Sequence, residues 1–222
     1  MNKIRTAVIG LGHLGSIHLK LINEIAKERS EIELSGAFDT DPVKNSTASE
    51  TYGIMAFGSV EEALGESDAV VIVTPTSTHF DIASASISKG VNTFIEKPVT
   101  ETTEQAEKLL EIAKGKKVKV QIGHIERFNA AILSLEDYNL APLFIETHRL
   151  SQFNPRGTDV SVIQDLMIHD IDIILNLVKS PVKAIDANGV AIITDKIDIA
   201  NARIRFENGC VANITASRIS QN

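Results

Sequence analysis

Four polar residues recur in segment 161–178, which is otherwise rich in isoleucine and leucine: Asp165, His169, Asp172 and Asn176. Their spacings of four, three and four place them in one stripe of an α-helix. A helix that is apolar over most of its circumference is expected to be largely buried, so its polar stripe needs partners, a metal or a bound ligand. Acid–base chemistry is the interpretation we favour, with His169 accepting a proton from a substrate hydroxyl and Asp165 orienting it or binding the substrate.

Two other interpretations of this stripe stay open. Asp165 and His169, at positions i and i+4, are two of the ligands that a metal site needs, but no further His or Cys obviously completes the set. The stripe is alternatively a core network whose members satisfy one another. We predict no metal.

A glycine-rich turn near the N-terminus carries a second chemistry. It reads Gly10-Leu11-Gly12-His13-Leu14-Gly15 and fits G-x-G-x-x-G. It follows an apolar strand and opens an amphipathic helix, so backbone N–H groups and the positive end of the helix dipole would face a pyrophosphate. Gly10 would allow the tight turn, Gly12 the close approach of the backbone, and Gly15 the close packing of helix on strand. For His13 alone, solvent exposure is the expected outcome.

An acidic residue, Asp39, ends the second expected strand 24 positions after Gly15. A carboxylate there accepts hydrogen bonds from ribose hydroxyls and repels a 2′-phosphate, which favours NAD over NADP. Methyl-transfer enzymes also combine a glycine-rich loop with an acidic residue after the second strand, so the turn alone does not exclude them. A regulator that senses NAD(H) without catalysis would also need the turn and Asp39.

Two later loops follow strands of the same expected parallel sheet, whose ligands bind at the carboxyl ends of the strands. The first runs from Thr74 through Pro75 and Thr76 to His79, and the second is Glu96-Lys97-Pro98. Lys97 would carry a fixed positive charge towards cofactor and substrate. A lone lysine is ordinarily a solvated surface charge, but this position raises the functional interpretation.

Together these residues resemble the Gfo/Idh/MocA oxidoreductases. The resemblance rests on the glycine turn, Thr74-Pro75 with His79, Glu96-Lys97-Pro98, and Asp165-x-x-x-His169-x-x-Asp172. It implies that Lys97 contacts both the substrate hydroxyl and the nicotinamide, that Glu96 lies near the cofactor, that His169 is the base and that Asp165 touches substrate. The chain departs from the family at Thr76, where Asn is frequent, and at 162–164, where glycines are frequent.

The resemblance also implies a set of cofactor-binding residues. These are Gly10, Gly12, His13, Leu14, Gly15, Asp39, Thr74, Pro75, Thr76, His79, Glu96 and Lys97. Lys97, Asp165 and His169 are the expected catalytic residues. Segment 148–172 resembles a subgroup that includes nucleotide-sugar 3-dehydrogenases. Other sugars and polyols stay open as substrates, and Arg127, Arg149 and Arg156 are candidates for binding an anion such as a phosphate.

Alternating strand-like and helix-like segments are expected to position these groups. We expect strands at 5–9, 33–38, 69–74, 93–95 and 118–122, and helices at 14–28, 79–89 and 104–114. On the first helix, Leu14, Ile17, Leu21, Ile22 and Ile25 form the apolar face. After residue 123 we expect helices at 129–135 and 161–178 and strands at 143–149, 182–193, 200–206 and 211–217, the last two joined by a hairpin turn.

This pattern predicts an α/β protein of two domains. Residues 1–122 would form a doubly wound parallel Rossmann sheet that binds the dinucleotide. Residues 123–222 would form an α+β substrate and oligomerisation domain with a mainly antiparallel open sheet. Because the sequence ends just after a strand and family members are usually longer, we expect a truncated chain. In the family the open sheet face commonly forms a dimer interface, so the resemblance implies a homo-oligomer.

Composition limits the classes of partner. Lys and Arg total 22 against 29 Asp and Glu, a net charge of −7, so the general attraction towards nucleic acid or an anionic membrane is missing. No apolar run approaches the ~20 residues of a membrane helix. The single cysteine, Cys210, is expected to be a small buried hydrophobe, and its solitary presence fits a reducing cytoplasm. We predict a cytoplasmic protein with a small-molecule partner.

Overall fold

The computed structural model of the chain describes residues 3–155 and 158–221. These residues divide into two compact units, Met1–Gly123 (unit 1) and His124–Asn222 (unit 2). No helix in the described part of the chain is both long and apolar enough to cross a membrane.

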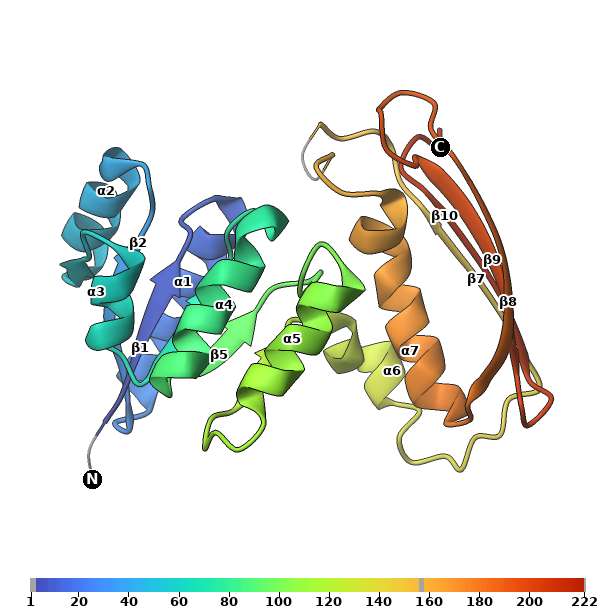
Figure 1. The fold of residues 1–222 in the computed structure, drawn as a ribbon, viewed down its shortest axis with the longest axis horizontal. Helices are drawn as coiled ribbons and strands as arrows, with labels where there is room; N and C mark the ends of the chain where they lie inside the picture. The colour runs from blue at the N-terminus through green and yellow to red at the C-terminus, as the bar shows by residue number, and fades with distance from the viewer. Residues whose placement is uncertain (1–2, 156–157, 222) are drawn as a thin grey trace. The chain divides into compact units, whose positions relative to one another are not determined.

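Unit 1 is built on a six-stranded sheet in which every pair of neighbours is parallel (Figure 1). The order is β3-β2-β1-β4-β5-β6, with bounds β1 Ile4–Ile9, β2 Ile32–Phe38, β3 Met55–Ala56, β4 Ala69–Ile72, β5 Asn92–Ile95 and β6 Val120–Ile122. Ile9 pairs with Phe38 and Ile72, and Ile72 pairs with Ile95. The loops after β1, β2, β4 and β5 therefore start side by side at one edge of the sheet.

Helices cover both faces of this sheet. They are α1 His13–Glu28, α2 Pro42–Tyr52, α3 Val60–Gly65, α4 Thr76–Lys89 and α5 Thr103–Ala113. A core that includes Leu19 and Ala48 joins α1 and α2 to one face, and a larger core that includes Ala63, Ile87 and Leu109 joins α3, α4 and α5 to the other. The predicted doubly wound parallel sheet is confirmed. The ends of two helices are capped: Thr102 and Gln105 form a capping box on α5, and Gly90 ends α4 in the left-handed conformation.

Of the apolar face predicted for α1, only Ile22 packs against the core. Leu14, Ile17, Leu21 and Ile25 are 40–48% exposed, while Gly15 and Leu19 are the buried residues of the helix. A Cβ at Gly15 would lie against the carbonyl of Gly10, so the helix approaches β1 through its glycine. That contact turns the Gly15 and Leu19 side of α1 towards the sheet and leaves the larger apolar residues outside.

Three elements of unit 1 were not predicted: α2, β3 and α3. The helix α2 begins at Pro42 after Asp41, whose side chain accepts a hydrogen bond from the N–H of Val43. Only Ala48 of α2 is buried, so the apolar periodicity that reveals a helix is missing. In addition, α4 begins at Thr76, three residues before the expected start.

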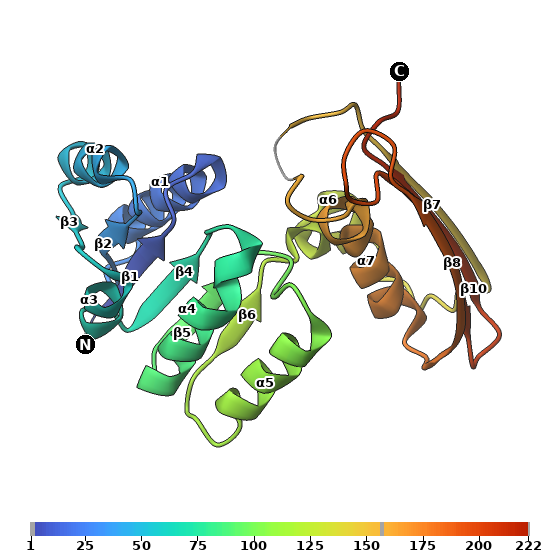
Figure 2. The same ribbon diagram turned by 45° about the horizontal axis from the view of Figure 1, so that its top comes forward.

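Unit 2 contains a mixed four-stranded sheet, which Figure 2 shows nearly edge-on. Its strand order is β7-β10-β9-β8. Its elements are η1 Ile125–Phe128, α6 Ala130–Leu133, β7 Phe144–Leu150, η2 Ile163–Met167, α7 Ile168–Val178, β8 Val182–Val190, β9 Ile199–Phe206 and β10 Val211–Ser217. The pairs β8–β9 and β9–β10 are antiparallel, whereas β10–β7 is parallel. One sheet face packs on η2 and α7 through a core that includes Ile174, Ile204 and Ile214.

Three local predictions for unit 2 need correction. The helix expected at 129–135 is shorter than predicted: it is the four-residue α6, and the 3₁₀ turn η1 precedes it. The strand expected to reach residue 193 ends at Val190, because the N–H groups of Ile192 and Ile193 donate to the Asp198 carboxylate instead of a neighbouring strand. The helix expected at 161–178 opens as the π-helix η2 before α7 begins. Cys210 is fully buried, as expected, and burial raises the pKa of its thiol.

Candidate functional site

The glycine turn has the geometry that a phosphate cradle needs. Gly10 has φ +96°, and a Cβ there would approach the carbonyl oxygen of Val73 to 2.7 Å. A Cβ at Gly12, by contrast, would meet nothing within 4 Å, so the backbone beside the start of α1 is open. His13 is exposed and Leu14 is 40% exposed in the first turn of that helix. The residues present therefore fit a dinucleotide, whose pyrophosphate needs close approach to a helix N-terminus.

Asp39 is joined directly to this turn. Its Oδ2 accepts a hydrogen bond from the N–H of Leu11 at 2.6 Å, and its Oδ1 accepts one from the N–H of Asp41 at 2.9 Å. Lys44 from α2 places its Nζ 3.6 Å from Oδ2. The carboxylate thus stands at the end of β2 beside the glycine turn, where the ribose of a dinucleotide is bound in this fold.

The loop after β4 is held by hydrogen bonds of its own. The hydroxyl of Thr78 donates to the Thr74 hydroxyl at 2.7 Å. Pro75 precedes the first residue of α4, Thr76, which is 7% exposed. His79 is only 1% exposed, with Nε2 2.9 Å from the carbonyl oxygen of Thr74. Its buried ring is therefore engaged by backbone rather than open to a ligand.

Glu96 and Lys97 follow β5 at the same sheet edge. Glu96 is 6% exposed, its Oε1 lies 2.8 Å from Nε2 of His18, and its Oε2 accepts a hydrogen bond from the N–H of Lys97 at 3.2 Å. Lys97 is half-buried. Unit 1 thereby brings the predicted glycine turn, Asp39, Thr74, Glu96 and Lys97 to one edge.

In unit 2 the residues of the predicted polar stripe differ in their surroundings. Asp165 lies in η2 and His169 in the first turn of α7, and both are half-buried. Asn176 is exposed. A π-helix at this place is notable because such turns occur frequently at functional sites.

Asp172 is the most enclosed member of the stripe. Its carboxylate receives two hydrogen bonds from Arg127, from Nε at 2.7 Å and from Nη2 at 2.6 Å. His124 places Nδ1 3.9 Å away. Burial opposes the charge of Asp172, but the Arg127 hydrogen bonds and the charges of His124, Arg127 and His169 outweigh it, so the pKa of Asp172 is lowered. Among the described residues, no group of three or more potential ligands forms a metal site.

The arginines expected to bind an anion are engaged with carboxylates. Arg127 is paired with Asp172, and Arg149 forms two hydrogen bonds with Asp170, at 3.0 Å and 2.9 Å. Arg156 lies outside the described residues. In Arg127 and Arg149, the salt-bridged outcome is therefore the one observed.

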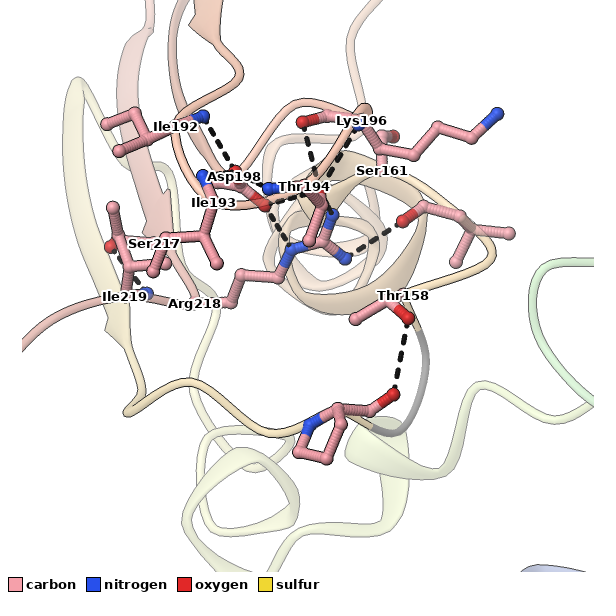
Figure 3. A network of polar contacts seen from close by, with 12 residues as sticks. Thr158, Ser161, Ile192, Ile193, Thr194, Lys196, Asp198, Ser217, Arg218 and Ile219 are labelled. Carbon is pink, nitrogen blue, oxygen red and sulfur yellow. Dashed lines mark hydrogen bonds and ion pairs between the residues drawn. The ribbon is translucent and has the colours of Figure 1, made fainter.

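A buried network anchors the entry to η2 (Figure 3). Asp198 is fully buried and accepts hydrogen bonds from the N–H groups of Ile192, Ile193 and Thr194 and from Nε of Arg218. Another Arg218 nitrogen, Nη1, donates to the carbonyl oxygen of Val160 at 2.9 Å. The network therefore ties the residues before β9 and after β10 to the backbone that leads into η2.

Sequence analysis did not single out His18, Lys44, Asp198 or Arg218. A histidine three residues after Gly15, on the same side of the helix start, was the available signal for His18. Lys44 required recognition of α2. The pairing of Asp198 with Arg218 has no local signal, because its partners come from separate strands and loops.

Fold and site together define a Rossmann-type dinucleotide-binding protein with an additional α/β unit. A family model described as "Oxidoreductase family, NAD-binding Rossmann fold" matches residues 4–124, and the model of the Gfo/Idh/MocA C-terminal domain matches residues 118–222. The chain therefore belongs to the Gfo/Idh/MocA family, and it is an NAD-binding oxidoreductase.

Relatives narrow its position in that family. UDP-N-acetylglucosamine 3-dehydrogenase of Acidithiobacillus ferrooxidans is 42% identical over 220 residues, which cover 99% of this chain and 68% of the relative. A solved structure of that enzyme matches with a TM-score of 0.92, over 100% of this chain and 72% of that one. Inositol 2-dehydrogenase of an Arthrobacter species is 31% identical over 182 residues, which cover 77% of this chain and 53% of the relative. The chain thus spans about half to two-thirds of the length of these curated relatives.

Proposed function

We propose that the protein transfers hydride between a hydroxyl-bearing carbon of a nucleotide sugar and the nicotinamide of NAD. The observation that carries the chemistry is the placement of Lys97 directly after β5, at the sheet edge that holds the glycine turn and Asp39. The substrate class is supported by the 42% identity to a UDP-N-acetylglucosamine 3-dehydrogenase over nearly the whole chain. Other sugars and inositols are alternative substrates, which the turnover assay below includes.

In this mechanism the chain's own residues accept the proton of the substrate hydroxyl and stabilise the negative charge that develops on its oxygen. His169 takes the proton of the substrate hydroxyl, and Asp165, one turn earlier, binds or orients the substrate. The ammonium of Lys97 stabilises negative charge on the same substrate oxygen. When bound, NAD supplies the hydride acceptor. The glycine turn and Asp39 would hold the pyrophosphate and the ribose, while Thr74, Pro75, Thr76, Glu96 and the exposed His13 and Leu14 line the same sheet edge.

Turnover assays test this proposal. Purified protein is mixed with NAD and UDP-N-acetylglucosamine, other UDP-sugars or inositols, and NADH absorbance is followed. We expect turnover with a UDP-sugar and losses of about 100-fold or more in kcat for Lys97→Ala and His169→Ala. Lys117→Ala, which removes an exposed lysine, is the matched control and should be fully active.

Three outcomes would contradict the proposal. Full turnover in Lys97→Ala and His169→Ala would remove both residues from the chemistry. Tight NADH binding without turnover on any substrate would favour a cofactor-sensing protein. S-adenosylmethionine is also added to the protein with bound NADH, and displacement of NADH by S-adenosylmethionine would favour the methyl-transfer alternative.

Self-association and a cytoplasmic location also stay proposals. The sheet face of unit 2 opposite α7 carries three exposed apolar residues, Phe144, Leu150 and Val190, which are 56–58% exposed. These residues support a homo-oligomer that uses this face. Light scattering coupled to gel filtration should give a mass above that of one chain, and Leu150→Glu should lower it. A mass equal to one chain would reject the homo-oligomer.

A further inference from the structure

Two histidines of unit 1 contact the residues on either side of Lys97. His18, from α1, places Nε2 2.8 Å from Oε1 of Glu96, the residue before the lysine. His79, from α4, places Nδ1 2.9 Å from the carbonyl oxygen of Pro98, the residue after it. The lysine backbone is therefore bracketed by contacts from two different helices.

On the first side, the Glu96 carboxylate is enclosed. His18 contacts one of its oxygens, and the N–H of Lys97 donates to the other at 3.2 Å. A Cβ at Gly123 would lie 2.8 Å from Oε2 of Glu96, so the chain after β6 closes on the carboxylate from another direction. The His18 ring also packs against Phe94 of β5, with ring centroids 5.4 Å apart. These contacts leave His18 and Glu96 little room to rearrange.

On the second side, His79 joins two loops. Its Nδ1 contacts the carbonyl oxygen of Pro98 and its Nε2 contacts that of Thr74, each at 2.9 Å, and the side chain is 1% exposed. A neutral imidazole donates one hydrogen bond, whereas an imidazolium donates two. Both partners are carbonyl oxygens and can only accept, so a neutral ring donates to one of the loops that follow β4 and β5, and an imidazolium donates to both.

We propose that His18 and His79 are positioning residues that set the location of Lys97. The proposal rests on the proposed function, in which Lys97 stabilises charge on the substrate oxygen. Neither histidine touches the reacting atoms in this assignment. Each acts through a neighbour of the lysine, His18 through the Glu96 carboxylate and His79 through the Pro98 carbonyl.

Glutamine and asparagine separate positioning from general structural damage. A glutamine amide places an N–H near the position of Nε2, and an asparagine amide places one near Nδ1. At position 18 the Nε2 contact matters, so His18→Gln should keep kcat within about 3-fold of wild type, while His18→Asn should lose about 10-fold or more, as expected for a misplaced catalytic group. At position 79 the order reverses, and His79→Asn should be more active than His79→Gln.

The control is His148, a histidine of β7 whose side chain is 57% exposed. His148→Gln and His148→Asn should both retain wild-type kcat. Equal activity of the Gln and Asn variants at position 18 would overturn the proposal, and so would unchanged kcat in His18→Ala and His79→Ala.

A second measurement does not depend on turnover. Lysines are reductively methylated with ¹³C-formaldehyde, and the NMR signal of Lys97 is assigned by its loss in Lys97→Ala. We expect this signal to move in His18→Asn and His79→Gln and to stay near its wild-type position in His18→Gln. If wild type turns over no substrate yet the signal follows this pattern, the proposed function fails and the positioning role stands. A signal unmoved in all variants rejects the positioning role whatever the activity.

Discussion

The two units hold their candidate residues by different physical means. In unit 1, backbone geometry positions the candidate residues. Neighbouring strands end in register, which places the glycine turn, Asp39 and Lys97 at one edge of the sheet, and hydrogen bonds such as that from the Leu11 N–H to Asp39 fix the loops. In unit 2, ion pairs hold η2, α7 and the backbone that leads into them, which carry Asp165 and His169. The pairs are Arg127 with Asp172, Arg149 with Asp170 and Arg218 with Asp198. Unit 1 should therefore be sensitive to added atoms, and unit 2 to lost charge and to pH.

The largest effect is expected from one added methyl group in the glycine turn. In Gly15→Ala the new Cβ lies against the Gly10 carbonyl, so α1 must move away from β1. We expect a loss of about 1–3 kcal/mol in the free energy of unfolding, typical of overpacking, together with loss of NADH binding. Urea unfolding and a fluorescence titration with NADH measure the two effects.

Two further glycines separate stability from binding. Gly12→Ala adds a Cβ that meets nothing within 4 Å, so its stability should stay near wild type while NADH binding weakens about 10-fold or more. Gly65→Ala, also with open space around the new Cβ and at the end of α3, should change neither. Unaltered NADH affinity in Gly12→Ala would show that the cofactor does not approach this turn.

Another large effect on stability concerns Asp198 and depends on pH. Hydrogen bonds from the N–H of Thr194 and from other donors hold the pKa of Asp198 far below its usual 3.8, against the opposing effect of burial. Because the folded-state pKa is the lower one, the stability that this ionised group contributes is complete above about pH 4 and is lost as the pH falls further.

Asp198→Asn should therefore destabilise the protein strongly at pH 7, because its NH₂ group would face backbone N–H donors or the Arg218 guanidinium. The difference in unfolding free energy between wild type and variant should be constant from pH 7 to about pH 4 and shrink below it. Urea unfolding across this range measures it. A difference that grows on acidification would contradict the assignment.

A smaller effect is expected at Arg127. Removing it in Arg127→Met leaves the Asp172 carboxylate, 10% exposed, without its main partner. Because half of the Arg127 side chain is exposed, the loss should be about 1–2 kcal/mol rather than the 3–5 kcal/mol of a fully buried pair. Arg205→Met is the control, because it breaks an exposed pair with Asp186 on the sheet of unit 2. It should lower the free energy of unfolding by less than about 1 kcal/mol. NADH affinity, a property of unit 1, should be unchanged in both variants.

Sequence patterns predicted the parts of the molecule that depend on neighbours along the chain. The strand–glycine–helix order around Gly10 and the hairpin turn between β9 and β10 are both local signals, and the structure contains each of them. The exposed apolar side of α1 was missed because hydrophobic spacing does not reveal which side a close glycine contact selects. Contacts between residues far apart in the sequence were also missed, because no local pattern connects them. His18 and Glu96 are 78 residues apart, and Arg127 and Asp172 are 45 residues apart.

The smallest effect tests the cofactor preference at the end of β2. Lys44 stands 3.6 Å from Asp39 and is 45% exposed, and Asp39 is the residue that would face a 2′-phosphate if the cofactor were NADP. An exposed pair of this kind contributes about 0–1 kcal/mol, so Lys44→Gln should change both the equilibrium constant of unfolding and the dissociation constant of NADH by less than about 5-fold. Since Asp39 repels a 2′-phosphate, the ratio of NADH to NADPH affinities should also stay constant. If Lys44→Gln instead weakens NADPH binding tenfold while leaving NADH binding intact, Lys44 holds a phosphate that Asp39 fails to exclude, and backbone geometry alone no longer accounts for specificity in unit 1.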